Sequence, residues 1–153
     1  MKVGFFAGSF DPFTNGHLHV VSESLKLFDK VVVGIAVNPD KTRRFDKFLM
    51  KQAIDEVFKT NTKVSCVVYD GLTVDEAKKH NSTMLVRGVR NEKDFLNEEK
   101  LAEANKKLSG LETIYIRTGE LADISSTMVF NKIQNNEDVS NLVPKEIFDA
   151  IKK

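Results

Sequence analysis

The chain alternates short apolar runs with longer amphipathic stretches along most of its length. Four of the apolar runs are rich in β-branched residues, a fifth at residues 3–7 contains two phenylalanines, and all five are continuous rather than alternating in polarity. Continuous apolar runs of this length are typical of strands that are covered on both faces of a sheet. We therefore expect strands at residues 3–7, 31–37, 64–69, 83–86 and 113–116.

The stretches between and after these runs carry apolar residues at helical spacing. We expect helices at residues 17–28, 47–59, 73–80, 93–108, 125–134 and 144–152. Strands and helices that follow one another in strict turn predict a doubly wound parallel sheet. The expected fold is a single Rossmann-like α/β domain over residues 1–153, with five parallel strands, helices on both faces and a helical C-terminal part.

Composition narrows the class of protein further. The 153 residues, 41% of them hydrophobic, suffice for one domain with a substantial core. A net charge of +1 argues against a broad basic face for a nucleic-acid polymer and fits a small anionic ligand better. The single Cys66, in an expected buried strand, excludes an internal disulfide framework. We find no signal peptide and no apolar run of membrane-spanning length, so we expect a cytoplasmic protein without a membrane partner.

The turn between the first expected strand and the first expected helix is the most informative segment. A buried strand runs through Gly8 into a turn, and the first turn of the following helix carries His17. Backbone N–H groups and an imidazole are thereby aimed at whatever lies beyond the end of the strand, which favours a phosphate site. The spacing matches neither a Walker loop nor a dinucleotide-binding fingerprint.

The ends of the other expected strands carry further polar side chains. In an open parallel sheet, ligands bind beyond the carboxyl ends of the strands. The second run leads into Lys41, and the fourth leads into Arg87 and Arg90. The chain beyond the fifth run enters a helix start at residues 123–127. Cations and helix N-termini at one edge of the sheet suit a ligand with several phosphates.

Each of these features also has a purely structural interpretation. Lys41, Arg43 and Arg44 form a charge run of the kind that is often a solvated loop. Arg87 needs an anionic partner beside a buried strand, but its spacing leaves open whether this is a ligand or an internal carboxylate. Residues 123–126 are also a good helix cap.

Thr14-Asn15-Gly16-His17 resembles the T/H-x-G-H signature of the nucleotidylyltransferase superfamily. Further motifs occur in the same order as in the bacterial phosphopantetheine adenylyltransferase family, over nearly the whole chain. They are Gly8 to Pro12, Arg87-Gly88-Val89-Arg90, Asp94-Phe95 with Glu98, Ala102 and Asn105, Ile124 to Thr127, and Asp138 to Pro144.

This resemblance implies an adenylyl transfer from ATP to 4′-phosphopantetheine that gives dephospho-coenzyme A and pyrophosphate. It implies a direct in-line attack without a covalent enzyme intermediate. Mg²⁺ would be carried on the ATP phosphates, with no metal-ligating residues of the chain's own. The resemblance also implies a homohexamer and feedback inhibition by coenzyme A.

The resemblance further assigns roles to individual residues. The catalytic residues would be His17, Lys41 and Ser9. Those that bind the phosphopantetheine substrate would be Ser9, Lys41, Thr73 and Arg87. Those that bind ATP would be Ser9, Phe10, His17, Gly88, Val89, Arg90, Glu98, Leu121, Ala122, Asp123, Ile124, Ser125, Ser126 and Thr127.

Some positions depart from the family pattern, and other functions stay open. Asn97 stands where tyrosine is frequent, Leu121 where tryptophan is frequent, and Phe130 where a basic residue is frequent, for which Lys132 could substitute. A related enzyme could instead adenylylate nicotinamide mononucleotide or cytidylylate glycerol 3-phosphate. The remaining alternatives are a nucleotide-binding regulator without catalysis and a structural assembly module.

Overall fold

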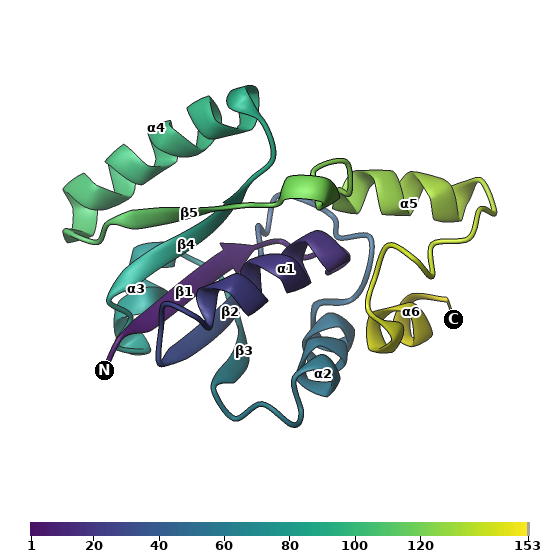
Figure 1. The fold of residues 1–153 in the computed structure, drawn as a ribbon, viewed down its shortest axis with the longest axis horizontal. Coiled ribbons are helices and arrows are strands. Elements are labelled where there is room, and N and C mark those ends of the chain that lie inside the picture. Colours follow the sequence, from purple (N-terminus) through teal and green to yellow (C-terminus); the bar gives the residue numbers. More distant parts are fainter. Residues whose placement is uncertain (153) are drawn as a thin grey trace.

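The computed structural model, which describes residues 1–152, contains one five-stranded sheet (Figure 1). All neighbouring strands pair in parallel, in the order β3-β2-β1-β4-β5. This confirms the predicted sheet. The strands are β1 (Val3–Gly8), β2 (Lys30–Ala36), β3 (Val64–Tyr69), β4 (Met84–Val89) and β5 (Thr113–Arg117).

Six α-helices occur where the sequence predicts them, with ends that differ by a few residues. A short 3-10 helix at Gly119–Leu121 was not predicted. The helices are α1 (Asn15–Ser24), α2 (Lys47–Val57), α3 (Thr73–Lys79), α4 (Glu92–Ser109), α5 (Ser126–Gln134) and α6 (Lys145–Ile151). None of the helices within residues 1–152 is both long and apolar enough to span a membrane.

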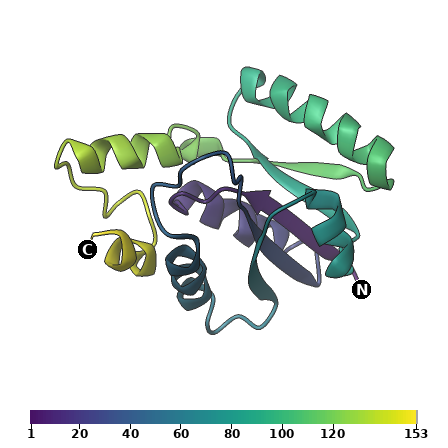
Figure 2. The same cartoon turned by 180° about the vertical axis from the view of Figure 1, so that it is seen from behind.

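Apolar side chains cover both faces of the sheet, which explains why the apolar runs of its strands are continuous rather than alternating in polarity. Phe6 belongs to a large cluster with residues of α1, α2, α5 and α6, whereas the adjacent Phe5 belongs to a smaller cluster with residues of α3. The two opposite views in Figures 1 and 2 show these helices on the two sides of the sheet. Cys66 is buried in the larger cluster, and burial raises its pKa to about 12.

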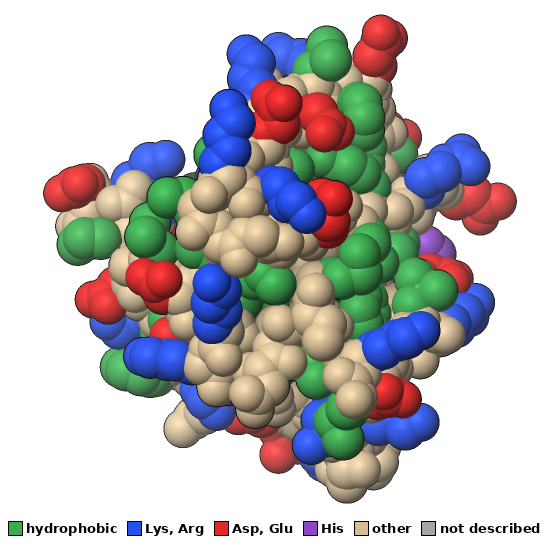
Figure 3. All heavy atoms as spheres, turned by 90° about the vertical axis from the view of Figure 1, so that its left-hand side faces the viewer, with side chains coloured by type: hydrophobic (Ala, Val, Ile, Leu, Met, Phe, Trp, Pro, Cys, Tyr) green, Lys and Arg blue, Asp and Glu red, His purple; other side chains and the backbone are tan. Residues whose placement is uncertain are grey.

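The predicted end of the fourth strand was wrong. The sequence ended the fourth strand at residue 86, but β4 continues to Val89, so that Arg87 and Gly88 lie within it, paired with β5. Helix α4 has no buried residue, and its Phe95 and Leu108 are 39% and 64% exposed. Figure 3 shows hydrophobic side chains grouped among charged ones on the side of the molecule that faces left in Figure 1.

Candidate active site

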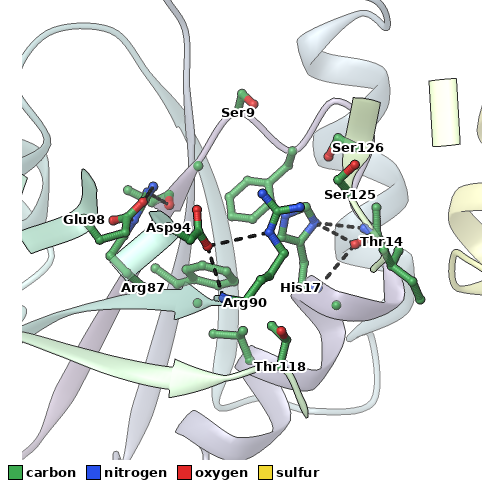
Figure 4. A pocket seen from close by; sticks show the side chains of 18 of the residues that line it. Ser9, Thr14, His17, Arg87, Arg90, Asp94, Glu98, Thr118, Ser125 and Ser126 are labelled. Carbon is green, nitrogen blue, oxygen red and sulfur yellow. Dashed lines mark hydrogen bonds and ion pairs between the residues drawn. The ribbon is translucent and has the colours of Figure 1, made fainter. Parts of the chain in front are cut away.

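A cavity of about 300 Å³ opens beyond the carboxyl ends of β1 and β4, beside the N-termini of α1 and α5 (Figure 4). This is the edge of the sheet where the sequence placed the ligand. The predicted site residues that line it are Ser9, Phe10, His17, Arg87, Gly88, Arg90, Glu98, Ile124, Ser125, Ser126 and Thr127.

Other predicted site residues do not line this cavity. Lys41 is exposed on the loop after β2, where its backbone N–H donates to the carbonyl of Asn38. Val89 ends β4, and residues 121–123 lead into the cavity wall at Ile124.

Thr73 lines a smaller cavity on the other face of the sheet, and its hydroxyl lies 2.8 Å from that of Tyr69. Arg87 and Glu98 line both cavities. The structure therefore places Thr73 next to the main cavity, with this arginine and this carboxylate between them.

His17 is held in one orientation by a capping box at the start of α1. The Thr14 backbone N–H donates to His17 Nδ1 at 2.9 Å, and the Thr14 hydroxyl accepts from the His17 backbone N–H at 3.4 Å. Because Nδ1 is an acceptor, the proton of the neutral ring is on Nε2. The Phe10 ring packs edge-on against the imidazole, with the ring centroids 4.8 Å apart.

The surroundings of His17 keep it neutral. Burial, followed by repulsion from the cations of Arg87 and Arg90, lowers its pKa from 6.5 to about 3. At neutral pH the ring thus offers one hydrogen-bond donor, Nε2–H, at the cavity wall. Such a group can stabilise an anionic oxygen without first gaining a proton.

The turn before His17 is fixed by close packing. Phe10 has a left-handed backbone, with φ of 47°, and is 1% exposed. Its ring lies where a side chain at Gly8 would be, since a Cβ built there would approach Phe10 Cζ to 3.0 Å. The absence of a side chain at Gly8 therefore allows the Phe10 ring to fold back beneath the turn.

The loop after β2 anchors the same turn. The Asp11 carboxylate accepts from the backbone N–H groups of Arg44 and Phe45 at 2.8 and 2.9 Å and forms an ion pair with Arg43 at 3.5 Å. Arg43 Nη1 also donates to the carbonyl of Ser9 at 2.7 Å. The interpretation of this run as a solvated basic loop is therefore wrong for Arg43, whose side chain is 14% exposed.

The opposite wall of the cavity carries two arginines paired with carboxylates of α4. Arg87 donates from Nε and Nη2 to both oxygens of Glu98, at 2.7 and 2.8 Å, and from Nη1 to the carbonyl of Ala7. Arg90 Nε lies 3.6 Å from a carboxylate oxygen of Asp94. In this structure the partner of Arg87 is thus an internal carboxylate, which the sequence left open.

The start of α5 forms the third part of the wall. Ser125 is its N-cap and accepts from the Met128 backbone N–H at 3.0 Å, as the structural interpretation of this segment predicted. The Ser126 hydroxyl donates to the carbonyl of Pro12 at 2.7 Å. The positive end of the α5 dipole is thereby held against the β1–α1 turn, which suits an anionic ligand.

The structure adds lining residues that the sequence did not assign, among them Thr14, Asp94 and Thr118. Thr118 is 6% exposed and follows β5 at the same edge of the sheet. Its position shortly after an apolar run could have identified it from the sequence as a site residue. Asp94 lies four residues after Arg90. This spacing brings the two side chains together only because a helix begins between them, and the sequence did not show this.

Comparisons with known proteins agree with the resemblance. The cytidylyltransferase-like family matches residues 5–132. The phosphopantetheine adenylyltransferase of Bacteroides thetaiotaomicron is 38% identical over 95% of this chain and 97% of its own length. That of Flavobacterium psychrophilum is 40% identical over 96% and 98%, and that of Francisella tularensis subsp. mediasiatica is 40% identical over 99% and 95%. The chain therefore belongs to the cytidylyltransferase-like family and, within it, to the phosphopantetheine adenylyltransferases.

Proposed function

We propose that this chain transfers the adenylyl group of ATP to 4′-phosphopantetheine, giving dephospho-coenzyme A and pyrophosphate. Family membership supports this pair of substrates, since relatives that match nearly the whole chain carry the activity in their name. The observation that carries the chemistry is the neutral His17, whose Nε2–H donor shares one cavity with two arginines and a helix N-terminus.

The reaction requires little covalent chemistry from the protein. An oxygen of the acceptor phosphate forms a bond to the α-phosphorus of ATP. The bond from the α-phosphorus to the oxygen that bridges to the β-phosphate breaks, and pyrophosphate leaves with the electron pair. The acceptor phosphate is already ionised, so no base has to remove a proton. The rate then depends on positioning and on stabilising the charge on the α-phosphate oxygens.

Individual residues fit distinct parts of this reaction. His17 would donate from Nε2 to an oxygen of the α-phosphate. Ser9 and Lys41 would hold the acceptor phosphate, with Lys41 reaching in from its exposed loop. Arg87 and Thr73 would contact the remainder of the phosphopantetheine, on the side where the smaller cavity opens.

ATP would lie along the wall made by β4, α4 and α5. Phe10, Gly88, Val89, Arg90 and Glu98 would contact the nucleotide, together with residues 121–127. The first turn of α5 would receive the phosphates, because its backbone dipole favours negative charge there.

Mg²⁺ would arrive as part of the nucleotide substrate. The carboxylates on the cavity wall, Asp94 and Glu98, are each held by an arginine. Within residues 1–152, no three His, Cys, Asp or Glu side chains gather in a way that could hold a metal ion. Oxygens of the ATP phosphates and water are the ligands that Mg²⁺ takes in such sites.

We further propose that the chain works in the cytoplasm as a homohexamer inhibited by coenzyme A. The uncovered apolar side chains of α4 support an assembled state, because a helix of this kind gains stability when another chain covers it. Coenzyme A carries both the pantetheine arm and the adenosine of the product, so it would compete for the same cavity. Sedimentation would give the mass of the assembly.

The function is tested by mixing the purified protein with MgATP and 4′-phosphopantetheine and following both products. We expect dephospho-coenzyme A and pyrophosphate to appear in equal amounts, while the intact mass of the protein stays unchanged. An adenylylated protein would contradict direct transfer. Absence of product with a folded, ATP-binding protein would overturn the proposed reaction.

A further inference from the structure

The charges on the wall of the main cavity nearly cancel before any ligand binds. Arg87 is paired with Glu98, and Arg90 is paired with Asp94. His17 is neutral, as shown above. A nucleoside triphosphate brings several negative charges into this cavity, and a balanced wall offers them little net attraction. The site therefore needs a cation that no internal carboxylate already neutralises.

Arg44 places such a cation beside the start of α5. Its Nη2 donates to the hydroxyl of Thr127 at 2.9 Å, and Thr127 lines the cavity. Its Nη1 donates to the backbone carbonyl of Asp11 at 3.2 Å. The guanidinium carbon lies 5.0 Å from the centre of the Phe130 ring, one turn further along α5.

The charge of Arg44 is not neutralised inside the protein. The guanidinium of Arg44 donates only to uncharged oxygens, and it forms no ion pair within residues 1–152. The adjacent Arg43, in contrast, is paired with Asp11. A cation at the N-terminus of a helix is electrostatically unfavourable, because the helix dipole is positive there. A bound anion reverses this unfavourable interaction, since it attracts both the guanidinium and the helix end.

Contacts with Phe130 and with the Asp11 backbone nevertheless hold the Arg44 side chain in place. The Phe130 ring supplies a face for a cation–π contact, and the Asp11 carbonyl belongs to the turn fixed by Asp11 itself. Because the ring contact and the Nη1 hydrogen bond already hold the guanidinium, it loses little further conformational freedom when it binds phosphate. Lys132, a cation of α5 itself, is instead paired with Glu137 at 3.5 Å.

We propose that Arg44 binds the phosphates of the nucleotide that lie beyond the α-phosphate, with Phe130 as its support. In the bound state, its Nη2 donates to a phosphate oxygen in place of the Thr127 hydroxyl, while Nη1 keeps the Asp11 carbonyl. This assignment rests on the proposed function, because it takes a nucleoside triphosphate as the ligand of the cavity.

The test compares the Kd of ATP with that of AMP, each measured by calorimetry with magnesium and without an acceptor. For Arg44→Gln, we expect the Kd of ATP to rise roughly tenfold or more, as for the loss of a charge-assisted hydrogen bond. The Kd of AMP should stay unchanged, because AMP lacks the distal phosphates. Arg44→Lys should recover part of the affinity for ATP, and Lys132→Gln, the matched loss of charge on α5, should bind ATP like the parent protein.

Two outcomes would overturn the role of Arg44. One is an unchanged Kd of ATP in Arg44→Gln, and the other is an equal loss for ATP and AMP, which indicates that the residue only holds the loop. If Arg44→Gln does not fold, Phe130→Leu takes its place. This variant leaves the cation but removes its support, so the Kd of ATP should rise by less than about tenfold while the Kd of AMP stays unchanged. An unchanged Kd of ATP would contradict the role of Phe130 as support.

ATP binding and product formation by the parent protein distinguish a failure of this proposal from a failure of the proposed function. A parent that binds ATP more tightly than AMP but forms no dephospho-coenzyme A contradicts the reaction and leaves Arg44 supported by the variant data. A parent that forms product while Arg44→Gln binds ATP normally contradicts only the role of Arg44. A parent that does not bind ATP overturns both.

Discussion

Two opposite walls of the cavity are built in different ways. The wall at β1 and α1 is held by backbone hydrogen bonds and buried rings, with His17 fixed by Thr14 and packed on Phe10. The wall at β4 and α4 is held by ion pairs between side chains, such as Arg87 with Glu98. The first wall belongs to the main core, whereas α4 contributes no buried residue.

This difference assigns transition-state stabilisation to the first wall and ligand binding to the second. Groups held by the core keep their geometry before a ligand arrives, which is what stabilising a transition state requires. An arginine held by a carboxylate can exchange that partner for a phosphate, and an exposed helix moves at small cost. We therefore expect changes in the first wall to lower the rate, and changes in the second wall to alter the affinity.

The largest expected effect comes from His17→Ala. This variant should lower kcat by about two orders of magnitude or more while the Kd of ATP is kept, because the lost donor acts mainly in the transition state. His17→Gln is the matched control, since glutamine preserves a neutral donor and the usual side chain of a capping box. An equal loss of ATP binding and of kcat in His17→Ala would contradict the catalytic role.

The pH dependence of stability follows next in size. In the unfolded chain the pKa of His17 is 6.5, and in the folded protein it is about 3. Between these values the unfolded state binds more protons, so the free energy of unfolding falls as the pH falls through this range. The contribution of His17 to this fall is about 2 kcal/mol between about pH 7 and pH 5.

Urea unfolding at both pH values measures this contribution. His17→Gln should lose that part of the pH dependence, and an identical dependence in the two proteins would contradict the lowered pKa. The ¹⁵N shifts of the His17 ring should stay those of the neutral Nε2–H form over the same range.

Lys41→Ala tests the loop that the structure leaves outside the cavity. We expect the KM for 4′-phosphopantetheine to rise about tenfold, as for loss of one charged hydrogen bond, with a much smaller change in the Kd of ATP. Steady-state kinetics and calorimetry give the two values. Parent-like kinetics would remove Lys41 from the site and leave Ser9 to hold the acceptor phosphate.

The smallest expected effect is a difference in hydrogen exchange. In protein diluted to single protomers and free of nucleotide, the amides of α4 should exchange several-fold faster than those of α1, since α4 has no buried side chain within its own protomer. Addition of MgATP should slow exchange in α4 more than in α1. Equal protection of both helices in the free protein would contradict the contrast between the two walls.

The sheet was predictable because its signal is local. The run from Val3 is apolar at every position, which is typical of a strand covered on both faces, and the structure places Phe5 and Phe6 in opposite clusters. The end of β4 was missed because Arg87 and Gly88 interrupt the apolar run, although the backbone ladder with β5 continues through them.

The contacts that complete the site depend on the folded chain. The spacing of Arg87 and Glu98 could not decide between a ligand and a carboxylate, because the pairing depends on where α4 lies over β4. Asp11 and Arg44 are 33 residues apart, and only the fold brings that loop to the turn. Helical spacing in α4 indicated an apolar face but not whether this chain covers it.

The release of pyrophosphate tests the central claim most directly. The purified protein is given MgATP with 4′-phosphopantetheine, MgATP with nicotinamide mononucleotide, and MgCTP with glycerol 3-phosphate. We predict release with 4′-phosphopantetheine alone. Release only with another pair would preserve the fold and the role of His17 but contradict the assignment of the acceptor, and with it the substrate roles of Lys41 and Arg87.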